Sequence, residues 1–514
     1  MELLKKNVRL SCIQKKMKKM KTVDEDVNLS ETKCDISKII CSTYDVMIEG
    51  IKTTEEKEAV RGYIEYDILY LCQDSGKLEH LNGKSFFEEN FETDNTISLS
   101  NVRVTADVED FTVKIINSRK VNIKALLEIV CTGDDIVEND IVVDTEGENV
   151  LTRKENMCFS QIKANCDDVI RIKEDVELPK NKPNVQRMIF SDVRIKSRES
   201  RVIEDGIYVK GDIGVFVIYE SDQESQMNEW YETALPFEGK IEINGVNEDM
   251  FSFIIIRLVE PSVTLKPDYD GEERVFGIEG IIQVSMKIYS EEEENVVWDM
   301  YSTCSHTSIE CENRGFQQMV LKNSLKARGY NKYQINGVQE KPLQICYSYG
   351  NAHIENAEIK ENELVINGYA DITVIYIAVD DASPMSSFKC QVPFAQTVAL
   401  NTDANKIEYI LDACIDQINA SMTGGDEIEV RVFVGIDILI MNIVEKEFIT
   451  DATMTPMTGK ELSSFPGIIG YIATSEETLW DIAKRYKTTT EKIKKVNKWN
   501  SDIVKRGDKL LITR

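Results

Sequence analysis

The sequence has 514 residues, with 61 Lys and Arg against 89 Asp and Glu, a net charge of −28, 12 Cys and 3 His. At roughly 100 to 200 residues per domain, this length predicts three to five domains. An apolar fraction of 42%, with 19 Tyr and 17 Phe, excludes a disordered chain, because such chains lack core-forming residues.

Residues 1–22 are predicted to form a basic N-terminal arm. Residues 1–21 hold 8 basic residues and 1 acidic residue. Leu10, Ile13, Met17 and Met20 recur at helical intervals. Two interpretations therefore stay open, a partly ordered arm and a helix that makes a peripheral contact with a membrane. The apolar residues do not join into a secretory signal, and no apolar stretch is long enough for a membrane helix. We therefore expect a cytoplasmic protein.

One pattern of alternating apolar residues occurs three times, and each copy is followed by a step that contains Phe and by a later alternating block. The copies are Val60–Tyr70, Val209–Tyr219 and Ile366–Tyr376, with Gly62, Gly211 and Gly368 as third residues; the steps end at Phe87, Phe237 and Phe394; the closing blocks are 121–130, 275–289 and 428–443. The glycines lie 149 and 157 residues apart, so the repeated unit is a domain and not a solenoid turn.

Each unit is predicted to be an antiparallel β domain, a sandwich or an open barrel. Its segments are short, alternate with period two and favour Val, Ile, Tyr and Phe. Because Val27 and Val176 each lie 35 residues before a repeat Gly, the first unit begins near residue 23. The predicted domains are 23–150, 170–310 and 330–455. For residues 156–168 and 317–326 the pattern does not decide between a short helix and a loop.

Residues 467–514 have a different pattern, strand–helix–helix–strand. Apolar residues from 479 to 486 fall on one helical face, and Thr478 with Asp481 is typical of a helix start. The second helix is predicted over 489–496, with Ile493 and Val496 on its inner face. Residues 471–473 and 509–512 are the predicted strands.

Neither the cysteines nor any motif indicates a cofactor or catalysis. The cysteines lack the spacing of a zinc site or a disulfide framework and are interpreted as buried, reduced thiols. Cys304, His306 and Cys311 lack a fourth ligand, so no metal is expected. No phosphate-binding loop, nucleophile elbow or zinc-protease motif occurs, which predicts a protein that is not an enzyme.

The charge is unevenly distributed along the chain. Residues 467–514 hold 11 basic and 6 acidic residues, and residues 22–466 carry a net charge of −40. So negative a body repels phosphate backbones and excludes nucleic acid as its partner. The basic C-terminal part is interpreted either as a solvated surface or as a surface that docks on an acidic partner or on the protein's own domains.

The last unit resembles a LysM domain. The residues at that family's spacing are Tyr471, Thr478, Leu479, Trp480, Ile482, Ala483, Tyr486, Ile493, Asn497, Ile503, Gly507, Leu510 and Ile512. The resemblance implies binding of N-acetylglucosamine glycans through the loop before the first helix and the loop after the second. Here the family's Gly-Asp-Thr turn is replaced by Glu476-Glu477-Thr478, which lacks the glycine and adds carboxylates that are costly to desolvate beside a neutral sugar.

The three β units resemble SPOCS domains, and the whole arrangement resembles the SipL-like spore-coat morphogenetic proteins. This resemblance implies a scaffold in the mother-cell cytoplasm at the forespore surface, which helps attach the basal coat layer by binding a coat morphogenetic ATPase. The expected class is mainly β, with three sandwich-like domains and a small βααβ domain.

The expected partner-binding residues are Glu476, Glu477, Thr478, Trp480, Trp499 and Ile503. Trp480 lies one position off the apolar helix face and Trp499 in a loop, so both rings are predicted to be partly exposed. Two other functions stay open. One is binding of peptidoglycan or N-acetylglucosamine, and the other is a cell-wall hydrolase with paired carboxylates that only folding would bring together.

Overall fold

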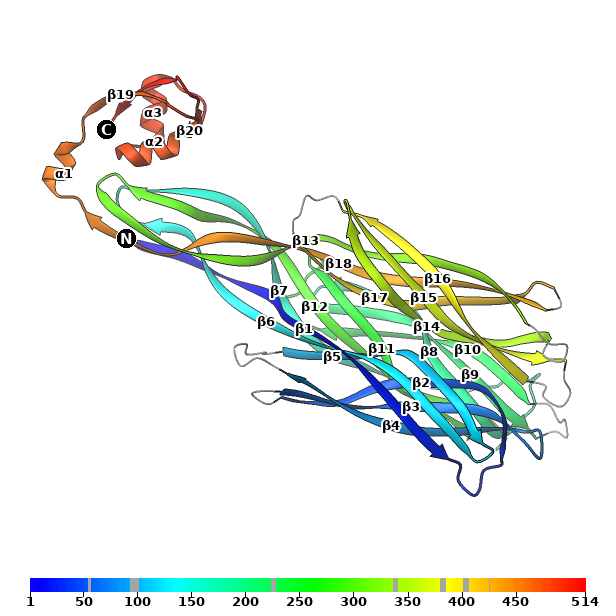
Figure 1. Ribbon diagram of the computed structural model, residues 1–514. Helices are drawn as coiled ribbons and strands as arrows, with labels where there is room; N and C mark the ends of the chain where they lie inside the picture. Colours follow the sequence, from blue (N-terminus) through cyan, green and yellow to red (C-terminus); the bar gives the residue numbers. More distant parts are fainter. Residues whose placement is uncertain are drawn as a thin grey trace.

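The structure is a computed structural model that describes residues 1–53, 57–92, 101–222, 228–335, 341–379, 385–400, 406–424 and 426–514. The side chains of residues 11–16, which include Ile13, Lys15 and Lys16, lie outside its description. Three β-sandwiches lie together at one end, a stalk of paired strands leads away from them, and a small domain lies at the tip of the stalk (Figure 1).

Each sandwich consists of six strands in two three-stranded antiparallel sheets, as the alternating repeats predicted. The first contains β1 (Glu2–Asn28), β2 (Ile36–Thr53), β3 (Lys57–Cys72), β4 (Leu78–Glu92), β5 (Asn101–Asn117) and β6 (Lys120–Glu146). The second contains β7 (Val150–Glu177), β8 (Val185–Ile203), β9 (Gly206–Ser221), β10 (Glu229–Glu242), β11 (Phe251–Pro267) and β12 (Glu273–Ser302). The third contains β13 (Ser305–Gln334), β14 (Pro342–Lys360), β15 (Glu363–Ala378), β16 (Met385–Ala399), β17 (Ile407–Met422) and β18 (Glu427–Pro456).

The repeated Gly and the repeated Phe face each other across two neighbouring strands. Gly62 pairs with Phe87, and Gly211 and Gly368 have the same partners in their own sandwiches. A Cβ on Gly211 would lie 2.1 Å from the Ser197 carbonyl oxygen and 2.7 Å from the Phe237 ring. The ring therefore covers a backbone position that no larger residue can occupy, which is why both residues recur in every unit.

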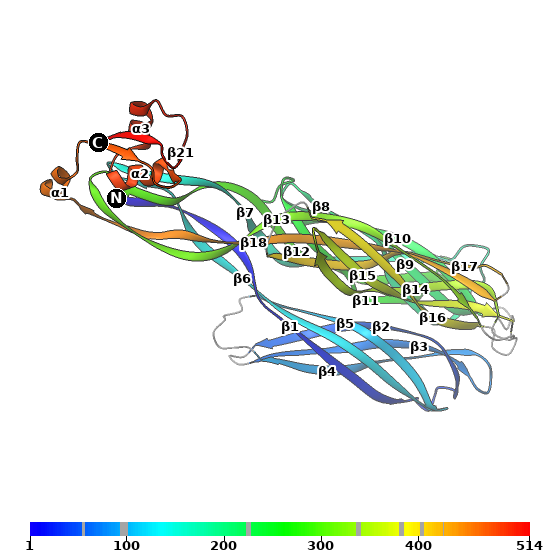
Figure 2. The same cartoon turned by 45° about the horizontal axis from the view of Figure 1, so that its top comes forward.

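The stalk is built from the outer halves of six long strands, which form the ribbons β1–β6, β7–β12 and β13–β18 (Figure 2). Each ribbon has a β-bulge near its tip, at Val143, Trp298 and Thr450. Just before each bulge two consecutive residues are buried, although neighbours in a regular strand face opposite ways. These residues are Ile141, Val142, Val296, Val297, Phe448 and Ile449. The first residue of each pair lies in one apolar cluster and the second in another, and all three ribbons contribute to both clusters.

The three sandwiches also share a core, formed by the sheets that contain β2, β8 and β14. Its buried residues include Ile40, Leu69, Phe190, Phe216, Tyr347 and Ile375. The Phe216 and Tyr347 rings stack with their centroids 4.1 Å apart. One apolar cluster therefore joins all three domains.

The N-terminal segment differs from the prediction. Residues 2–28 form one strand paired with β6 along its length, and not a separate arm or a membrane-surface helix. Its lysines contact the acidic body, since Lys6 pairs with Glu292 at 3.3 Å and Lys19 with Glu89 at 3.2 Å. Pairing of opposite charges and a backbone ladder that is interrupted by two bulges explain why the segment is ordered. The stretches 156–168 and 317–326 lie in strands β7 and β13.

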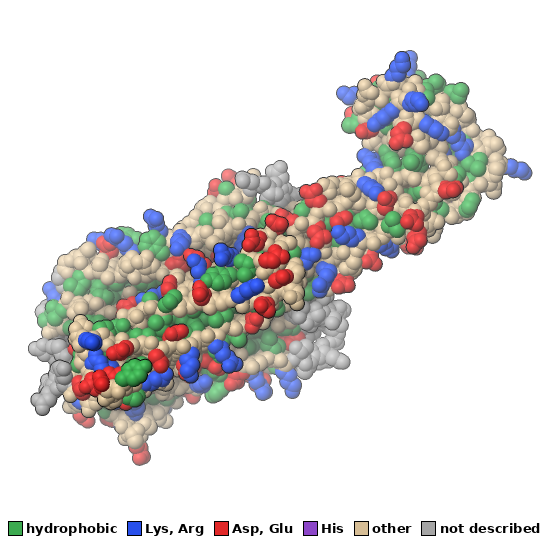
Figure 3. Space-filling model, turned by 180° about the vertical axis from the view of Figure 1, so that it is seen from behind, with side chains coloured by type: hydrophobic (Ala, Val, Ile, Leu, Met, Phe, Trp, Pro, Cys, Tyr) green, Lys and Arg blue, Asp and Glu red, His purple; other side chains and the backbone are tan. Residues whose placement is uncertain are grey.

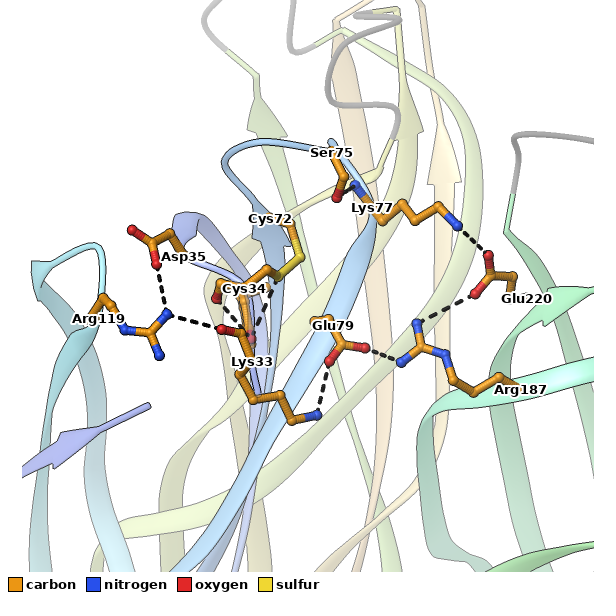
Figure 4. Close-up of a disulfide and its surroundings, with 11 residues drawn as sticks. Lys33, Cys34, Asp35, Cys72, Ser75, Lys77, Glu79, Arg119, Arg187 and Glu220 are labelled. Carbon is orange, nitrogen blue, oxygen red and sulfur yellow. Dashed lines mark hydrogen bonds and ion pairs between the residues drawn. A yellow bond between two sulfur atoms is a disulfide. The ribbon is translucent and has the colours of Figure 1, made fainter. Parts of the chain in front are cut away.

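The prediction that all cysteines are reduced thiols is wrong for two of them. Cys34 and Cys72 form a disulfide, with their Cα atoms 5.7 Å apart (Figure 4). Cys34 lies in the loop before β2 and Cys72 ends β3, and these strands are neighbours. The pair arises from strand pairing and has no sequence motif, so spacing alone could not reveal it. Nine other cysteines among the described residues are free.

Ion pairs beside this disulfide join the first two sandwiches. Glu79 accepts from Lys33 at 2.9 Å and also pairs with Arg187 of β8 (Figure 4). Lys77 pairs with Glu220 at 2.6 Å, which adds a second contact across the same boundary. These ion pairs hold the edge strand β4 against the second domain.

The C-terminal domain has the predicted strand–helix–helix–strand order. It consists of β19 (Ile468–Ile472), β20 (Glu477–Thr478), α2 (Leu479–Tyr486), α3 (Thr490–Asn497), β21 (Ile503–Val504) and β22 (Lys509–Thr513), after the short helix α1 (Gly459–Ser464). Leu479, Ile482, Ala483 and Ile493 are buried as expected. Val496 is 41% exposed, contrary to prediction, because Asn497 takes the inward position and its side chain bonds the backbone of Leu511.

Two isoleucines that differ in burial, Ile438 and Ile281, test the strand register of the sandwiches. Ile438 is 1% exposed within the core. Ile281, which lies in the predicted closing block 275–289, is only partly buried, next to the buried Ile282. Ile438→Asp should lower the free energy of unfolding by about 3 kcal/mol or more, since it buries an unpaired charge. Ile281→Asp is the matched control. Similar thermal melting temperatures for the two variants would contradict the register.

A buried carboxyl at the junction of the domains should make stability depend on pH. Burial and the negative charge of Asp192 raise the pKa of Asp67 to about 7, and Asp67 Oδ1 has no hydrogen-bond partner within the described residues. In the unfolded chain the Asp67 carboxyl ionises near pH 4. The free energy of unfolding therefore falls as pH rises from about 4 to about 7, because the folded protein resists this ionisation. The Tm gain of Asp67→Asn over the parent should therefore grow across that range and then level off. Asp74→Asn, in the exposed turn after β3, is the control. A gain that does not change with pH would contradict this origin.

Candidate functional site

Two loops of the C-terminal domain are tied together into one surface. The loop before α2 and the loop after α3 pair as strands, with Glu477 opposite Val504 and Thr478 opposite Ile503. Ala473 adds two backbone bonds to the second loop, at 3.0 and 2.8 Å, and Leu479 N–H donates to Asp502 O at 2.8 Å. Backbone bonds at both ends of the pair make these loops a fixed platform.

The two adjacent glutamates have different roles. Glu477 accepts a hydrogen bond from the Tyr471 hydroxyl at 2.8 Å and pairs with Arg485 at 2.8 Å. The Tyr471 bond, together with Arg485, lowers the pKa of Glu477, so this carboxylate stays charged and is compensated inside the domain. Glu476 is exposed and makes no ion pair with any described residue. Of the two glutamates, Glu476 is therefore the one with an uncompensated charge.

Thr478 and Ile503 face each other across the short pair. The Thr478 hydroxyl accepts from Asp481 N–H at 3.2 Å and donates to the Asp481 carboxylate at 2.6 Å, so it caps helix α2. Ile503 is 47% exposed. The outward side of the platform thus combines a free carboxylate with an aliphatic side chain.

The two tryptophans turn their rings away from solvent. Trp499 is half-buried and packs against the core of the domain. Its indole nitrogen is buried without a hydrogen-bond partner in the described part of the chain. Trp480 is also half-buried, but it faces the stalk. Its Nε1–H donates to Asp299 Oδ2 at 2.7 Å, and its ring meets Tyr301 edge-to-face at 4.9 Å.

These contacts belong to a docking interface between the C-terminal domain and ribbon β7–β12. Lys484 pairs with Asp299 at 2.7 Å, and the buried Tyr301 hydroxyl donates to Thr488 O at 2.7 Å. Asp299 and Tyr301 could not be predicted from the sequence, because they lie some 180 positions from their partners and show no motif. Of the six predicted residues, the structure brings Glu476, Glu477, Thr478 and Ile503 together on the paired loops. Trp499 lies in the second of these loops but packs its ring against the core, and Trp480 contacts the stalk.

Comparison with known families accounts for both parts of the architecture. The model described as "SipL, SPOCS domain" matches residues 35–116, 184–266 and 341–423, and a LysM domain model matches residues 471–513. The chain is a SipL-like protein with three SPOCS domains and a LysM domain. Each SPOCS match covers four strands, from β2 to β5 in the first domain, and ends before the long closing strand. No curated protein and no solved structure matches the chain.

The described residues show neither a membrane helix nor a metal cluster. No described helix is long and apolar enough to cross a bilayer. No group of three or more His, Cys, Asp or Glu within the described ranges is placed to hold a metal ion. The LysM surface is thus characterised by its platform and by its docking on the stalk.

Removing Asp299 should loosen the LysM domain from the stalk. Asp299→Ala deletes the acceptor of both Trp480 and Lys484 and leaves an indole N–H unpaired, which costs about 1–3 kcal/mol. Hydrogen exchange should speed up in α2 and around Tyr301, while melting of the SPOCS domains changes little. Asp502→Ala is the control, because the Asp502 side chain is 79% exposed and its one ion pair among the described residues is with Lys494. Equal exchange in both variants would contradict the docking.

Proposed function

We propose that the protein is a non-enzymatic scaffold of the spore coat whose LysM domain binds a coat morphogenetic ATPase. In this proposal the protein acts in the mother-cell cytoplasm and helps attach the basal coat layer to the forespore surface. SPOCS and LysM domains fit a coat-associated protein of sporulation with a binding module at its C-terminus. Both are binding domains and not catalytic families, which supports a scaffold.

The observation that carries the choice of a protein partner is the composition of the LysM platform. Glu476 is exposed and uncompensated, and Ile503 is exposed on the second of the two loops, which are joined by backbone bonds. A carboxylate next to an aliphatic side chain suits a protein surface that offers a cation and an apolar contact. A neutral sugar would have to desolvate the carboxylate without gaining an ion pair.

The position of the LysM domain supports the same function. The domain lies at the tip of a stalk built by all three SPOCS domains, away from the sandwiches (Figure 2). Trp480 already contacts Asp299, so a partner that uses this ring would have to share it with the stalk or displace the stalk. We propose that binding centres on Glu476 and Ile503, with Glu477 and Thr478 holding the loop.

Binding of peptidoglycan is the second candidate, favoured by the LysM match itself. The two candidates predict different ligands for the same platform. Titration of the full chain with N-acetylglucosamine oligomers separates them. Affinity near micromolar would favour the glycan, and absence of binding at millimolar concentration would favour the protein partner.

The test of the proposal uses the full chain as bait in a lysate of sporulating cells. Glu476→Lys with Ile503→Lys should reduce recovery of the ATPase at least about tenfold, since the change reverses the charge and removes the apolar contact. The control is Ile359→Lys with Glu361→Lys, an exposed pair of the same residue types in the third SPOCS domain. Quantitative mass spectrometry measures recovery. Equal recovery with both variants, or no ATPase with the parent, would rule the proposal out.

A further inference from the structure

The LysM domain has a basic surface that the rest of the chain does not neutralise. Lysines and arginines gather over this domain, whereas acidic side chains lie along the stalk (Figure 3). Lys484, Arg485 and Lys494 have acidic partners at 2.6–2.8 Å. Other basic side chains of the domain make no ion pair with any described residue. They are Lys492, Lys495, Lys498, Lys505, Arg506 and Lys509.

Half of these free charges lie on or beside the outer face of helix α3. Lys492, Lys495 and Val496 share one face of the helix at i, i+3 and i+4, and Lys498 follows at its C-terminal cap. All four are exposed, Val496 at 41%. The contacts of the LysM domain with the stalk come from other residues, chiefly Trp480, Lys484 and Thr488. The α3 face is thus an open surface with three cations around one aliphatic side chain.

The complementary surface is the turn between β11 and β12 in the second SPOCS domain. The Asp268 carboxylate accepts from the backbone N–H groups of Asp270 and Glu272, both at 2.9 Å, which fixes the turn. Tyr269 is fully exposed at its tip. Asp270, Glu272 and Glu273 are exposed and make no ion pair within the described residues. A fixed turn therefore presents an aromatic ring among acidic side chains.

A single chain cannot bring these two surfaces together. Strand β12 runs 30 residues from Glu273, next to the acidic turn, to Ser302, next to the LysM contact Tyr301. At about 3.3 Å per residue the two ends lie roughly 100 Å apart. The paired strand β7 stiffens this distance along its whole length. The charges on the two surfaces can therefore be matched only between molecules.

We propose that the α3 face of one chain binds the acidic β11–β12 turn of a second copy, so that the chains associate head to tail. Lys492, Lys495 and Lys498 would oppose Asp270, Glu272 and Glu273, and the Tyr269 ring would pack on Val496. The two faces are different, so the contact is heterologous and leaves a free surface at each end of the assembly. This inference rests on charge and topology and is independent of the ATPase proposal.

Two neutral variants and their mixture test the arrangement. Lys492→Gln with Lys495→Gln removes one surface, and Asp270→Asn with Glu272→Gln removes the other. The parent should form oligomers in sedimentation velocity at about 50 mM salt. The dissociation constant of the contact should be about tenfold higher at about 500 mM salt. Each variant alone should be monomeric. Their equimolar mixture should stop at the dimer, because only one productive contact is left.

A matched control and three outcomes make the test decisive. Lys114→Gln with Lys124→Gln changes two exposed lysines of the first domain and should leave the oligomers intact. A monomeric parent at low salt would overturn the proposal, as would oligomers that persist in both variants. So would a monomeric parent that binds anionic phosphatidylglycerol vesicles through Lys492 and Lys495, since the α3 face would then belong to a membrane. Unchanged melting temperatures show that all variants are folded.

Discussion

Three ribbons of paired strands extend beyond their sandwiches, and each ribbon carries apolar side chains that its own sandwich does not cover. These side chains are buried only where the three ribbons pack against one another. Near the tips consecutive residues such as Val296 and Val297 are both buried, in two clusters to which all three ribbons contribute. A ribbon of two strands is at best marginally stable alone in water, so the stalk exists only when all three domains contribute. The position of the LysM domain depends on this stalk, because Asp299 and Tyr301 lie at the end of one ribbon.

Much of the fold could be predicted because the repeat has a local physical cause. The Gly and the Phe of each unit pair across neighbouring strands, and the steric need for both keeps them visible in the sequence at Gly211 and Phe237. The LysM elements were predictable for a similar reason, since helical spacing and the Thr478 cap are local signals. Ile281 shows the limit of such patterns, because two adjacent isoleucines fit either face of a strand.

The features that the sequence did not reveal depend on residues far apart in the chain. The disulfide joins Cys34 to Cys72, and the docking joins Trp480 to Asp299, in both cases through the tertiary arrangement. The same holds for the strand formed by residues 2–28, whose partner begins at Lys120. For the candidate site, the two loops were predictable from the family resemblance. The compensation of Glu477 by Arg485 was not, because a carboxylate in a sequence carries no sign of its partner.

The order in which the ribbons are completed has a consequence for the newly made protein. During synthesis β1 leaves the ribosome more than 90 residues before its partner β6, and the apolar clusters that the ribbons share are closed only when Phe448 and Ile449 have emerged. Pairings this distant in sequence form late and slowly. A truncated or stalled chain can fold its first sandwich but cannot complete the stalk. The LysM domain, which follows the three sandwiches in the chain, therefore finds its docking surface complete only after all three ribbons have been made and paired.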